Sequence, residues 1–294
     1  MTDENKPEID AALVSRLVAA QFPQWAHLDI RAVEHGGWDN RTFHLGDAMS
    51  VRLPSADGYV PQVEKEHRWL PFLASRLTMP IPTPLGLGRP SAEFSRPWSV
   101  YGWLHGEVAT HADIPDLPKF ARSLAQFLVA LRGVDATDGP AAGDHSFQRG
   151  ADLAFYDEET RRAIEVLRDR IDGGAAAAIW DDALSTTWTA PPVWFHGDIS
   201  DGNLLVTGGD LSAVIDFGTC GVGDPACDLV IAWTFLDEAS REAFREAVQL
   251  DDDTWARARG WAIWKALIVA AGFTGTNSPS GGRALRVIAD LTSV

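Results

Sequence analysis

The sequence predicts an α+β fold with two lobes, a small β-rich lobe over residues 1–101 and a larger helical lobe over residues 102–294. Three observations support this division. Short extended segments separated by glycine turns occur early in the chain, and helical spacing of apolar residues prevails after Leu117. Among the later helices, two apolar strands flanking Gly208 and Gly209 predict a hairpin. A chain of 294 residues is long enough to give two such lobes ample core.

The elements of the first lobe follow from local periodicity and turn residues. Leu13, Leu17 and Val18 share one face of a helix, while Gly36 and Gly37 form a turn between extended segments. In chain order, we expect a helix over 11–22, extended segments around the glycine turn and over 50–53, a helix over 62–73 and a strand over 98–101.

The second lobe is mostly helical. Apolar residues recur at helical spacing from Leu117 to Leu131, and Gly133 is a helix stop. A short apolar strand over 193–195 leads towards the hairpin strands over 203–206 and 211–215. Further helices are expected over 152–171, 175–184, 225–236, 240–250 and 254–272, with a short one after 282.

The composition excludes several classes of function. A net charge of −16 argues against a nucleic-acid partner, because phosphate backbones recruit basic patches. It fits a cationic substrate in an acidic cleft, and equally fits solubility alone. No secretory signal is visible, and the apolar stretch over 266–273 is too short to span a bilayer. With only Cys220 and Cys227, the chain fits a reducing cytoplasm and lacks a zinc motif.

One group of polar residues at fixed spacing indicates a catalytic function. Asp198 ends the triplet His196-Gly197-Asp198, and Asn203 comes five residues after it. Asp216, eighteen residues after Asp198, begins an Asp-Phe-Gly triplet. Phosphoryl transfer has a loose transition state, so it needs a carboxylate to orient the attacking hydroxyl and oxygen ligands for magnesium. The predicted hairpin returns the chain, so we expect Asp216 close to Asn203. Alone, the His-Gly-Asp triplet is an ordinary loop turn; the combined pattern favours phosphoryl transfer.

The chain resembles the aminoglycoside and macrolide phosphotransferase family of the protein-kinase-like superfamily. The resemblance rests on residues 196–203, 215–218 and 223–229, and it extends from about Val33 to the last long helix. It implies a bilobal protein-kinase-like fold whose first lobe binds nucleotide and whose second holds the catalytic and acceptor sites. The same group includes kinases of choline, homoserine and sugars, so the motifs do not specify a substrate.

The resemblance assigns roles in the second lobe. Asp198 would be the base that orients the acceptor hydroxyl, and Asn203 and Asp216 would bind Mg²⁺. His196 would support the loop as a buried residue rather than touch substrate. Asp228 would be the buried carboxylate that braces the catalytic loop; its alternative is a charge at a helix N-terminus after Pro225.

The resemblance also implies a binding site for ATP or GTP. Arg52 stands where the family has a lysine that binds the phosphates, with Glu66 as its partner and Glu64 as a competitor. A second departure is Thr219, which follows the Asp-Phe-Gly triplet where many aminoglycoside enzymes carry arginine. The implied nucleotide-binding residues are Gly36, Gly37 and Asn40 in the phosphate loop, Arg52 and Glu66 behind it, and Tyr101 and Trp103 in the hinge.

The acceptor is expected to be a small molecule with a hydroxyl group, and the chain a monomer or weak dimer. An acidic site for a polycation and an aromatic wall for a macrolide are both open, and many of the twelve tryptophans fit helical core positions equally well. Antibiotic resistance, metabolic phosphorylation and a pseudokinase role remain alternatives. The residues concerned are Asp201, Asp224, Asp237 and Glu238 on the acidic side, and Trp233, Phe235, Trp255, Trp261 and Trp264 on the aromatic side.

Overall fold

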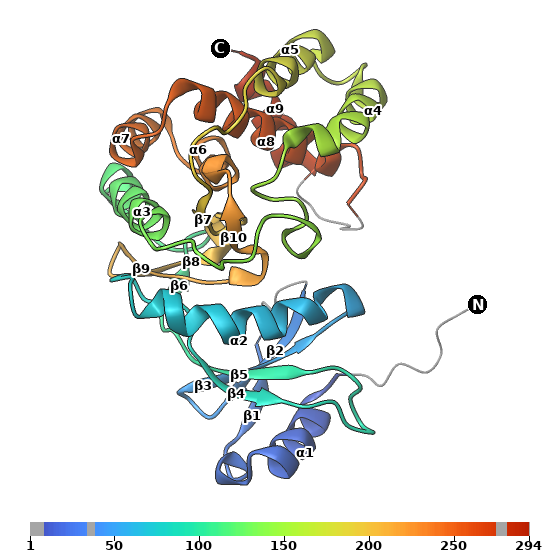
Figure 1. The fold of residues 1–294 in the computed structure, drawn as a ribbon, viewed down its shortest axis with the longest axis vertical. Coiled ribbons are helices and arrows are strands. Elements are labelled where there is room, and N and C mark those ends of the chain that lie inside the picture. Colours follow the sequence, from blue (N-terminus) through green and yellow to red (C-terminus); the bar gives the residue numbers. More distant parts are fainter. Residues whose placement is uncertain (1–8, 34–38, 275–280, 294) are drawn as a thin grey trace, which may run out of the picture. The chain divides into compact units, whose positions relative to one another are not determined.

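The computed structural model describes residues 9–33, 39–274 and 281–293. The chain divides into two compact units (Figure 1). The first comprises Met1–Gly106 together with Ala213–Gly218, and the second comprises Glu107–Ser212 together with Thr219–Val294. The segment with the Asp-Phe-Gly triplet therefore belongs to the first unit, although the residues on both sides of it belong to the second.

The first unit is built on an antiparallel sheet with strand order β1-β2-β3-β5-β4. Side chains alternate between its faces, so Val51 and Leu53 of β3 pack with α1 while Arg52 points towards α2. The elements are α1 (Ala11–Gln21), β1 (Ile30–Ala32), β2 (Asn40–Leu45), β3 (Met49–Pro54), α2 (Val60–Ala74), β4 (Pro84–Gly88) and β5 (Trp98–Gly102).

The second unit is mainly helical, with two small sheets of order β10-β7 and β6-β8-β9. The strands are β6 (Glu107–Val108), β7 (Val193–Phe195), β8 (Leu204–Thr207), β9 (Asp210–Val214), whose last two residues belong to the first unit, and β10 (Gly221–Gly223). The helices are α3 (Leu117–Arg132), α4 (Asp157–Leu167), α5 (Gly173–Leu184), α6 (Ile231–Thr234), α7 (Glu238–Val248), α8 (Asp252–Ala270) and α9 (Gly281–Thr292).

Two expected helices are shorter than their periodicity predicts. The segment over 152–171 is a 3₁₀ turn, Leu153–Tyr156, followed by α4, which ends at Leu167. The segment over 225–236 is a 3₁₀ turn, Pro225–Leu229, followed by the single turn of α6. In the second case, the Asp228 carboxylate accepts two tertiary hydrogen bonds from the chain after β7, and such contacts override local helix propensity. The glycine-linked hairpin of β8 and β9 is confirmed.

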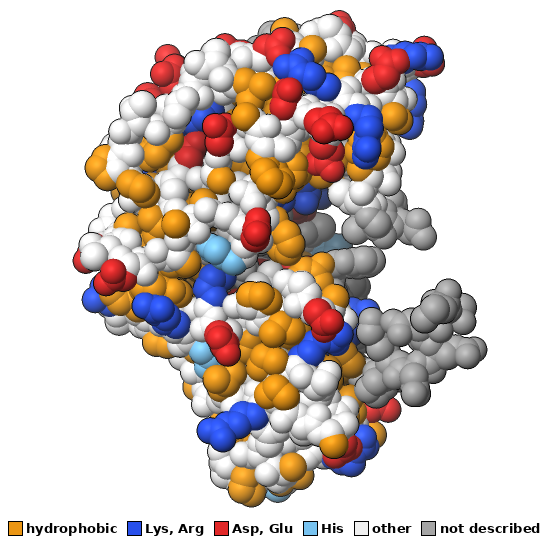
Figure 2. Space-filling model, turned by 45° about the vertical axis from the view of Figure 1, so that its right-hand side comes forward, with side chains coloured by type: hydrophobic (Ala, Val, Ile, Leu, Met, Phe, Trp, Pro, Cys, Tyr) orange, Lys and Arg blue, Asp and Glu red, His pale blue; other side chains and the backbone are white. Residues whose placement is uncertain are grey.

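The described surface mixes both signs of charge. Acidic and basic side chains are interspersed over the face drawn in Figure 2. Exposed pairs such as Lys119–Asp210 and Arg161–Asp181 account for part of that mixing. No helix in the part of the chain that the structure describes has the length and hydropathy required of a membrane span.

Asp251 caps α8 and should make the unit's stability depend on pH. Its carboxylate accepts from the backbone N–H of Thr254 at 2.8 Å and from the Thr254 hydroxyl, and these bonds lower the pKa of Asp251. A lowered carboxyl pKa adds stability above the unfolded value of about 3.9, and this is lost as pH falls through the folded value. Asp251→Ala is therefore expected to cost about 1 kcal/mol at neutral pH. Thermal unfolding over a pH series should show this difference vanishing in acid; a constant difference would contradict the assignment.

Candidate active site

The chain after β7 is fixed by one buried carboxylate. Asp228, 2% exposed, accepts hydrogen bonds from the backbone N–H groups of His196 at 2.8 Å and Gly197 at 2.7 Å. Gly197 has φ +88°, and a Cβ there would lie 2.8 Å from the Thr219 hydroxyl oxygen. Only glycine fits this conformation and this space. The structure thus gives Asp228 the bracing contacts that the resemblance implied, with the backbone just before Asp198.

His196 is a supporting residue of the loop, as expected. It is fully buried, and its Nδ1 accepts from the backbone N–H of Asp198 at 3.2 Å. Its carbonyl oxygen accepts from the Thr219 hydroxyl at 3.0 Å. Thr219, which the sequence marked only as a departure from the family pattern, is therefore a second support of this loop.

Asp198 and Asn203 lie together. The Asn203 side-chain amide donates to the Asp198 backbone carbonyl at 2.9 Å and to its carboxylate at 3.0 Å. These bonds fix the direction of the half-buried carboxylate. They use the amide nitrogen of Asn203 and leave its side-chain oxygen as an acceptor, which is the atom that a magnesium ion would require.

In the first unit, Arg52 joins two carboxylates. Its guanidinium lies 3.8 Å from the Glu66 carboxylate and 3.4 Å from that of Asp216. Burial lowers the pKa of Arg52, but the two carboxylates outweigh that effect and the net pKa is raised. Glu66 also accepts from the Tyr101 hydroxyl and is 5% exposed, whereas Glu64 faces solvent. The geometry thus selects Glu66 over Glu64 as the partner of Arg52.

Asp216 has an unusual backbone conformation. Its φ is +68°, which non-glycine residues adopt rarely and mostly where the surrounding structure imposes it. The backbone carbonyl of Gly218 in the same segment accepts from the Lys65 ammonium at 2.7 Å. Sequence reasoning missed Lys65; its only signal is its place on the buried face of the helix, one turn before Trp69.

The other residues predicted to bind nucleotide lie in different surroundings. Asn40 begins β2 opposite Pro54 and is buried. Tyr101 is a buried member of β5, and the backbone N–H of Trp103 donates to the carbonyl of Ala48 at 2.8 Å. Gly36 and Gly37 lie outside the described residues. The assignment of all these residues to nucleotide binding stays a prediction, as does the closeness of Asn203 and Asp216, which belong to different units.

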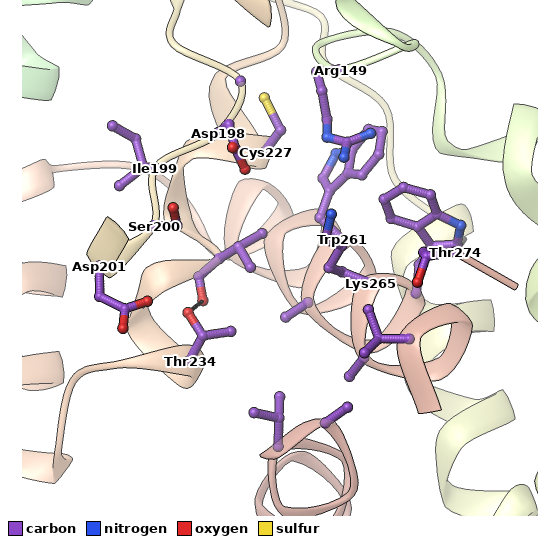
Figure 3. A pocket seen from close by; sticks show the side chains of 18 of the residues that line it. Arg149, Asp198, Ile199, Ser200, Asp201, Cys227, Thr234, Trp261, Lys265 and Thr274 are labelled. Carbon is purple, nitrogen blue, oxygen red and sulfur yellow. Dashed lines mark hydrogen bonds between the residues drawn. The ribbon is translucent and has the colours of Figure 1, made fainter. Parts of the chain in front are cut away.

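A cavity of about 380 Å³ opens beside Asp198 within the second unit. Figure 3 shows Asp198, Ile199, Ser200 and Asp201 on one side of it and Arg149, Trp261 and Lys265 on the other. The rest of the lining is largely apolar and comes from helices α8 and α9, with Trp264, Ala266, Val269, Ala284 and Val287 among the residues.

The acidic wall considered from the sequence is largely absent from this cavity. Of the four acidic residues named for it, only Asp201 lines the cavity. Asp224 forms a buried ion pair elsewhere, and Asp237 caps α7 by accepting from the backbone N–H of Ser240 at 2.9 Å. Glu238 lies in the exposed first turn of α7. Asp224 and Asp237 are N-terminal caps and Glu238 lies in a first turn. Carboxylates at these positions stabilise the free N–H groups of the first turn.

The aromatic wall is present in part. Trp261 and Trp264 line the cavity. Trp255 does not line it and packs edge-on against Trp233, with ring centroids 5.5 Å apart. Phe235 packs against Phe120. Helical spacing alone did not separate the indoles that line the cavity from those that fill the core.

Residues 29–261 match the phosphotransferase enzyme family. The chain belongs to this family. Among curated relatives of this phosphotransferase, an aminoglycoside 3'-phosphotransferase of Escherichia coli is 37% identical over 68 residues, which are 23% of this chain and 25% of that protein. A hygromycin-B 4-O-kinase of Escherichia coli is 24% identical over 235 residues, 74% of this chain and 65% of that protein. The matched regions thus span less than two thirds of either relative.

Solved structures confirm the kinase-like α+β fold of this phosphotransferase. The GDP complex of an aminoglycoside 2'-phosphotransferase superposes with a TM-score of 0.72 at 15% identity, covering 97% of this chain and 99% of that one. A macrolide 2'-phosphotransferase from Brachybacterium faecium gives a TM-score of 0.61 at 22% identity, covering 96% and 98%. The resemblance to aminoglycoside and macrolide phosphotransferases is therefore confirmed.

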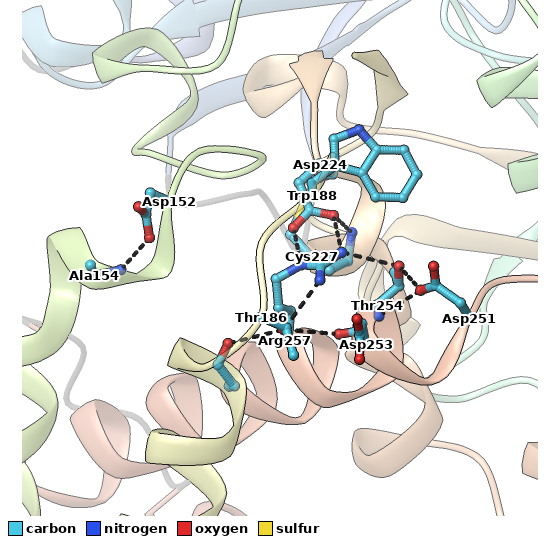
Figure 4. Close-up of polar contacts among 12 residues, drawn as sticks. Asp152, Ala154, Thr186, Trp188, Asp224, Cys227, Asp251, Asp253, Thr254 and Arg257 are labelled. Carbon is cyan, nitrogen blue, oxygen red and sulfur yellow. Dashed lines mark hydrogen bonds and ion pairs between the residues drawn. The ribbon is translucent and has the colours of Figure 1, made fainter. Parts of the chain in front are cut away.

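A buried ion pair fixes the turn that carries Asp228. Figure 4 shows Arg257 of α8 bound to Asp224, the capping residue of that turn. The Arg257 Nε lies 2.7 Å from the Asp224 carboxylate, and both side chains are less than a tenth exposed. The guanidinium also donates to the hydroxyls of Thr254 at 3.0 Å and Thr186 at 3.2 Å. With its donors engaged in this way, Arg257 links α8 to the turn whose Asp228 braces the chain before Asp198.

Arg257→Ala is expected to destabilise the phosphotransferase by about 3–5 kcal/mol, because it leaves the Asp224 carboxylate buried without a counter-charge. Arg245→Ala on α7 is the matched control. That arginine pairs with Asp252 at the surface, where such pairs contribute about 0–1 kcal/mol. Urea unfolding of both variants measures the contrast, and equal small losses would contradict the role given to Arg257.

Proposed function

We propose that this phosphotransferase moves the γ-phosphoryl group of ATP or GTP to a hydroxyl group of a small molecule, with Asp198 as the residue that orients the hydroxyl. The observation that carries this proposal is the fixed Asp198 carboxylate at the edge of a cavity. The cavity lies in the range of about 300–1,000 Å³ that small-molecule sites occupy.

In this mechanism Asp198 accepts a hydrogen bond from the acceptor hydroxyl and receives its proton as the new O–P bond forms. Because phosphoryl transfer is loose, alignment contributes more than early proton removal. The bonds from Asn203 hold the carboxylate, and the bonds from Asp228 hold the backbone before it. ADP or GDP leaves as the other product.

The residues present suit a magnesium ion. The free side-chain oxygen of Asn203 and the Asp216 carboxylate are hard oxygen ligands of the type that Mg²⁺ prefers. When bound, the ion would neutralise charge on the nucleotide phosphates. The rare backbone conformation of Asp216 supports a functional role for that residue.

Nucleotide binding is assigned to the first lobe, residues 1–101, and catalysis and acceptor binding to residues 102–294. Arg52 would contact the phosphates, since a guanidinium keeps its charge and binds oxyanions in a bidentate way. Glu66 would hold Arg52, while Gly36, Gly37 and Asn40 would approach the phosphates. Tyr101 and Trp103 would line the pocket for the nucleotide base.

The chemical class of the acceptor is proposed from the relatives. The relatives named above act on aminoglycosides, hygromycin and macrolides, so an antibiotic acceptor with a resistance role is one candidate. A metabolic alcohol such as choline, homoserine or a sugar is the alternative. We place the protein in the cytoplasm as a monomer or weak dimer that binds neither nucleic acid nor membrane.

One observation favours a second candidate, a nucleotide-binding pseudokinase. Arg52 replaces the family lysine and is engaged by two carboxylates, Glu66 and Asp216. If Arg52 stays paired with these carboxylates when nucleotide binds, no guanidinium contacts the nucleotide phosphates. Magnesium-dependent nucleotide binding without turnover over a broad acceptor panel would favour this candidate.

Asn203→Ala tests the magnesium assignment. Removing a metal-binding oxygen should raise the magnesium concentration needed for half-maximal activity at least about tenfold. A magnesium titration of ADP or GDP formation measures this, and a chelator should abolish activity in the unmodified enzyme. An unchanged requirement for magnesium would exclude Asn203 as a ligand.

A further inference from the structure

The cavity beside Asp198 has an unusual distribution of charge. Its lining carboxylates are those of Asp198 and Asp201. Asp201 is neutralised, because Arg283 of α9 binds both of its oxygens at 3.0 and 3.2 Å and the Thr110 hydroxyl donates to it at 3.0 Å. Asp198 is reserved for the acceptor hydroxyl in the proposed function. The lining therefore offers no further carboxylate to a cationic ligand.

Three cationic side chains, Arg149, Lys265 and Arg283, belong to this lining, and Arg149 has no carboxylate partner among the described residues. Over the described residues, its side chain forms no salt bridge; it donates hydrogen bonds to the Phe147 carbonyl at 3.2 Å and to the Tyr156 hydroxyl. Its guanidinium stacks on Trp264 and Trp261, with 4.7 and 5.5 Å to the ring centroids. Stacking stabilises the planar group from one face and leaves donors at its edge for an oxyanion.

The surface on which Arg149 stacks is itself fixed. The indole N–H of Trp264 donates to the Glu159 carboxylate at 2.9 Å, and the Tyr156 ring lies 4.2 Å from that of Trp264. Figure 3 shows Arg149 projecting from its loop beside Trp261, on the side of the cavity away from Ile199 and Asp201. The cation is thus held in place in the largely apolar lining that also includes Asp198.

We propose that the acceptor is a compact, largely apolar alcohol that carries a carboxylate, with the carboxylate bound by Arg149 and the hydroxyl at Asp198. This inference rests on the proposed function. A charge-assisted, bidentate contact in a partly apolar site favours a carboxylate over a neutral amide, and the same cation repels an ammonium group. The volume of about 380 Å³ is at the low end for drug-sized ligands, which favours a compact acceptor over a polycationic oligosaccharide.

The test uses three alcohols of nearly equal size: para-(hydroxymethyl)benzoate, para-(hydroxymethyl)benzamide and para-(aminomethyl)benzyl alcohol. Their affinities are measured by calorimetry on the full chain with a magnesium nucleotide present. We expect the benzoate to bind at least about tenfold more tightly than the benzamide, and the ammonium compound to bind most weakly. Arg149→Gln should remove the preference for the benzoate.

Arg245→Gln is the matched control, because Arg245 also stacks on an indole, that of Trp255 at 5.0 Å, but does not line the cavity. It should keep the preference. No benzoate binding, equal binding of benzoate and benzamide, or a preference that survives Arg149→Gln would overturn the inference. Benzoate binding through Arg149 without any ADP or GDP formation would instead support the carboxylate-bearing ligand class and count against the proposed phosphoryl transfer.

Discussion

Asp198→Ala is expected to lower kcat at least about a hundredfold, the loss that follows removal of a positioned general base. Its carboxylate is the group that would align the acceptor hydroxyl, and its direction is already fixed by Asn203 at 3.0 Å. Nucleotide affinity should be unchanged, because the residues assigned to nucleotide binding belong to the other unit of the chain. Initial rates and nucleotide titrations of the same preparation give both quantities.

The control for Asp198 is Asp210→Ala. Asp210 is an exposed residue at the start of β9 that pairs with Lys119, so its removal should leave kcat unaffected. Asp198→Asn adds an isosteric comparison, since it keeps the side-chain shape but loses the proton acceptor. If Asp198→Ala turns over at the unmodified rate, the mechanism assigned to this residue is wrong.

Asp228→Ala is expected to have the second large effect, on stability and activity together. Two buried N–H groups, those of His196 and Gly197, would lose their acceptor. Each unsatisfied group costs about 1–3 kcal/mol, so the total loss is about 2–6 kcal/mol. The loop before Asp198 would also lose its fixed geometry, and kcat should fall. Urea unfolding and steady-state kinetics measure the two effects.

Asp237→Ala provides the comparison for Asp228. It also removes a carboxylate that accepts from a backbone N–H, at 2.9 Å, but this residue lies at the exposed start of α7. A cap of this kind contributes about 1 kcal/mol, and kcat should not change. Equal losses of stability in the two variants, or full activity in folded Asp228→Ala protein, would refute the bracing role of Asp228.

Local signals in the sequence predicted the parts of the site that are continuous in the chain. The glycine turn identified the hairpin of β8 and β9, and Glu66, expected as the partner of Arg52 ahead of Glu64, lies on the buried face of α2. Asp198, Asn203 and Asp216 stood out because the phosphoryl-transfer chemistry they suggest needs these residue types at that spacing. His196 and Asp228 were placed correctly because the family pattern already carries their tertiary role.

Contacts between distant segments that the family pattern does not carry were not predictable. The Lys65 ammonium reaches Gly218, Arg257 neutralises Asp224, and Arg283 neutralises Asp201, with both partners far apart in sequence in each case. Periodicity reports which face of an element is buried but not which charge it meets there. For the same reason an acidic acceptor wall was considered from residues that the structure uses as helix caps and ion-pair partners.

The central claim is that this phosphotransferase moves a phosphoryl group to a hydroxyl. The most direct measurement uses nucleotide labelled at the γ-phosphorus, with a panel of hydroxyl acceptors and magnesium, and follows where the label goes. Transfer predicts one labelled phosphate ester for each ADP or GDP formed, dependence on magnesium, and loss of ester in Asp198→Ala. Label found only in unreacted nucleotide or free phosphate, across the whole panel, would contradict the claim.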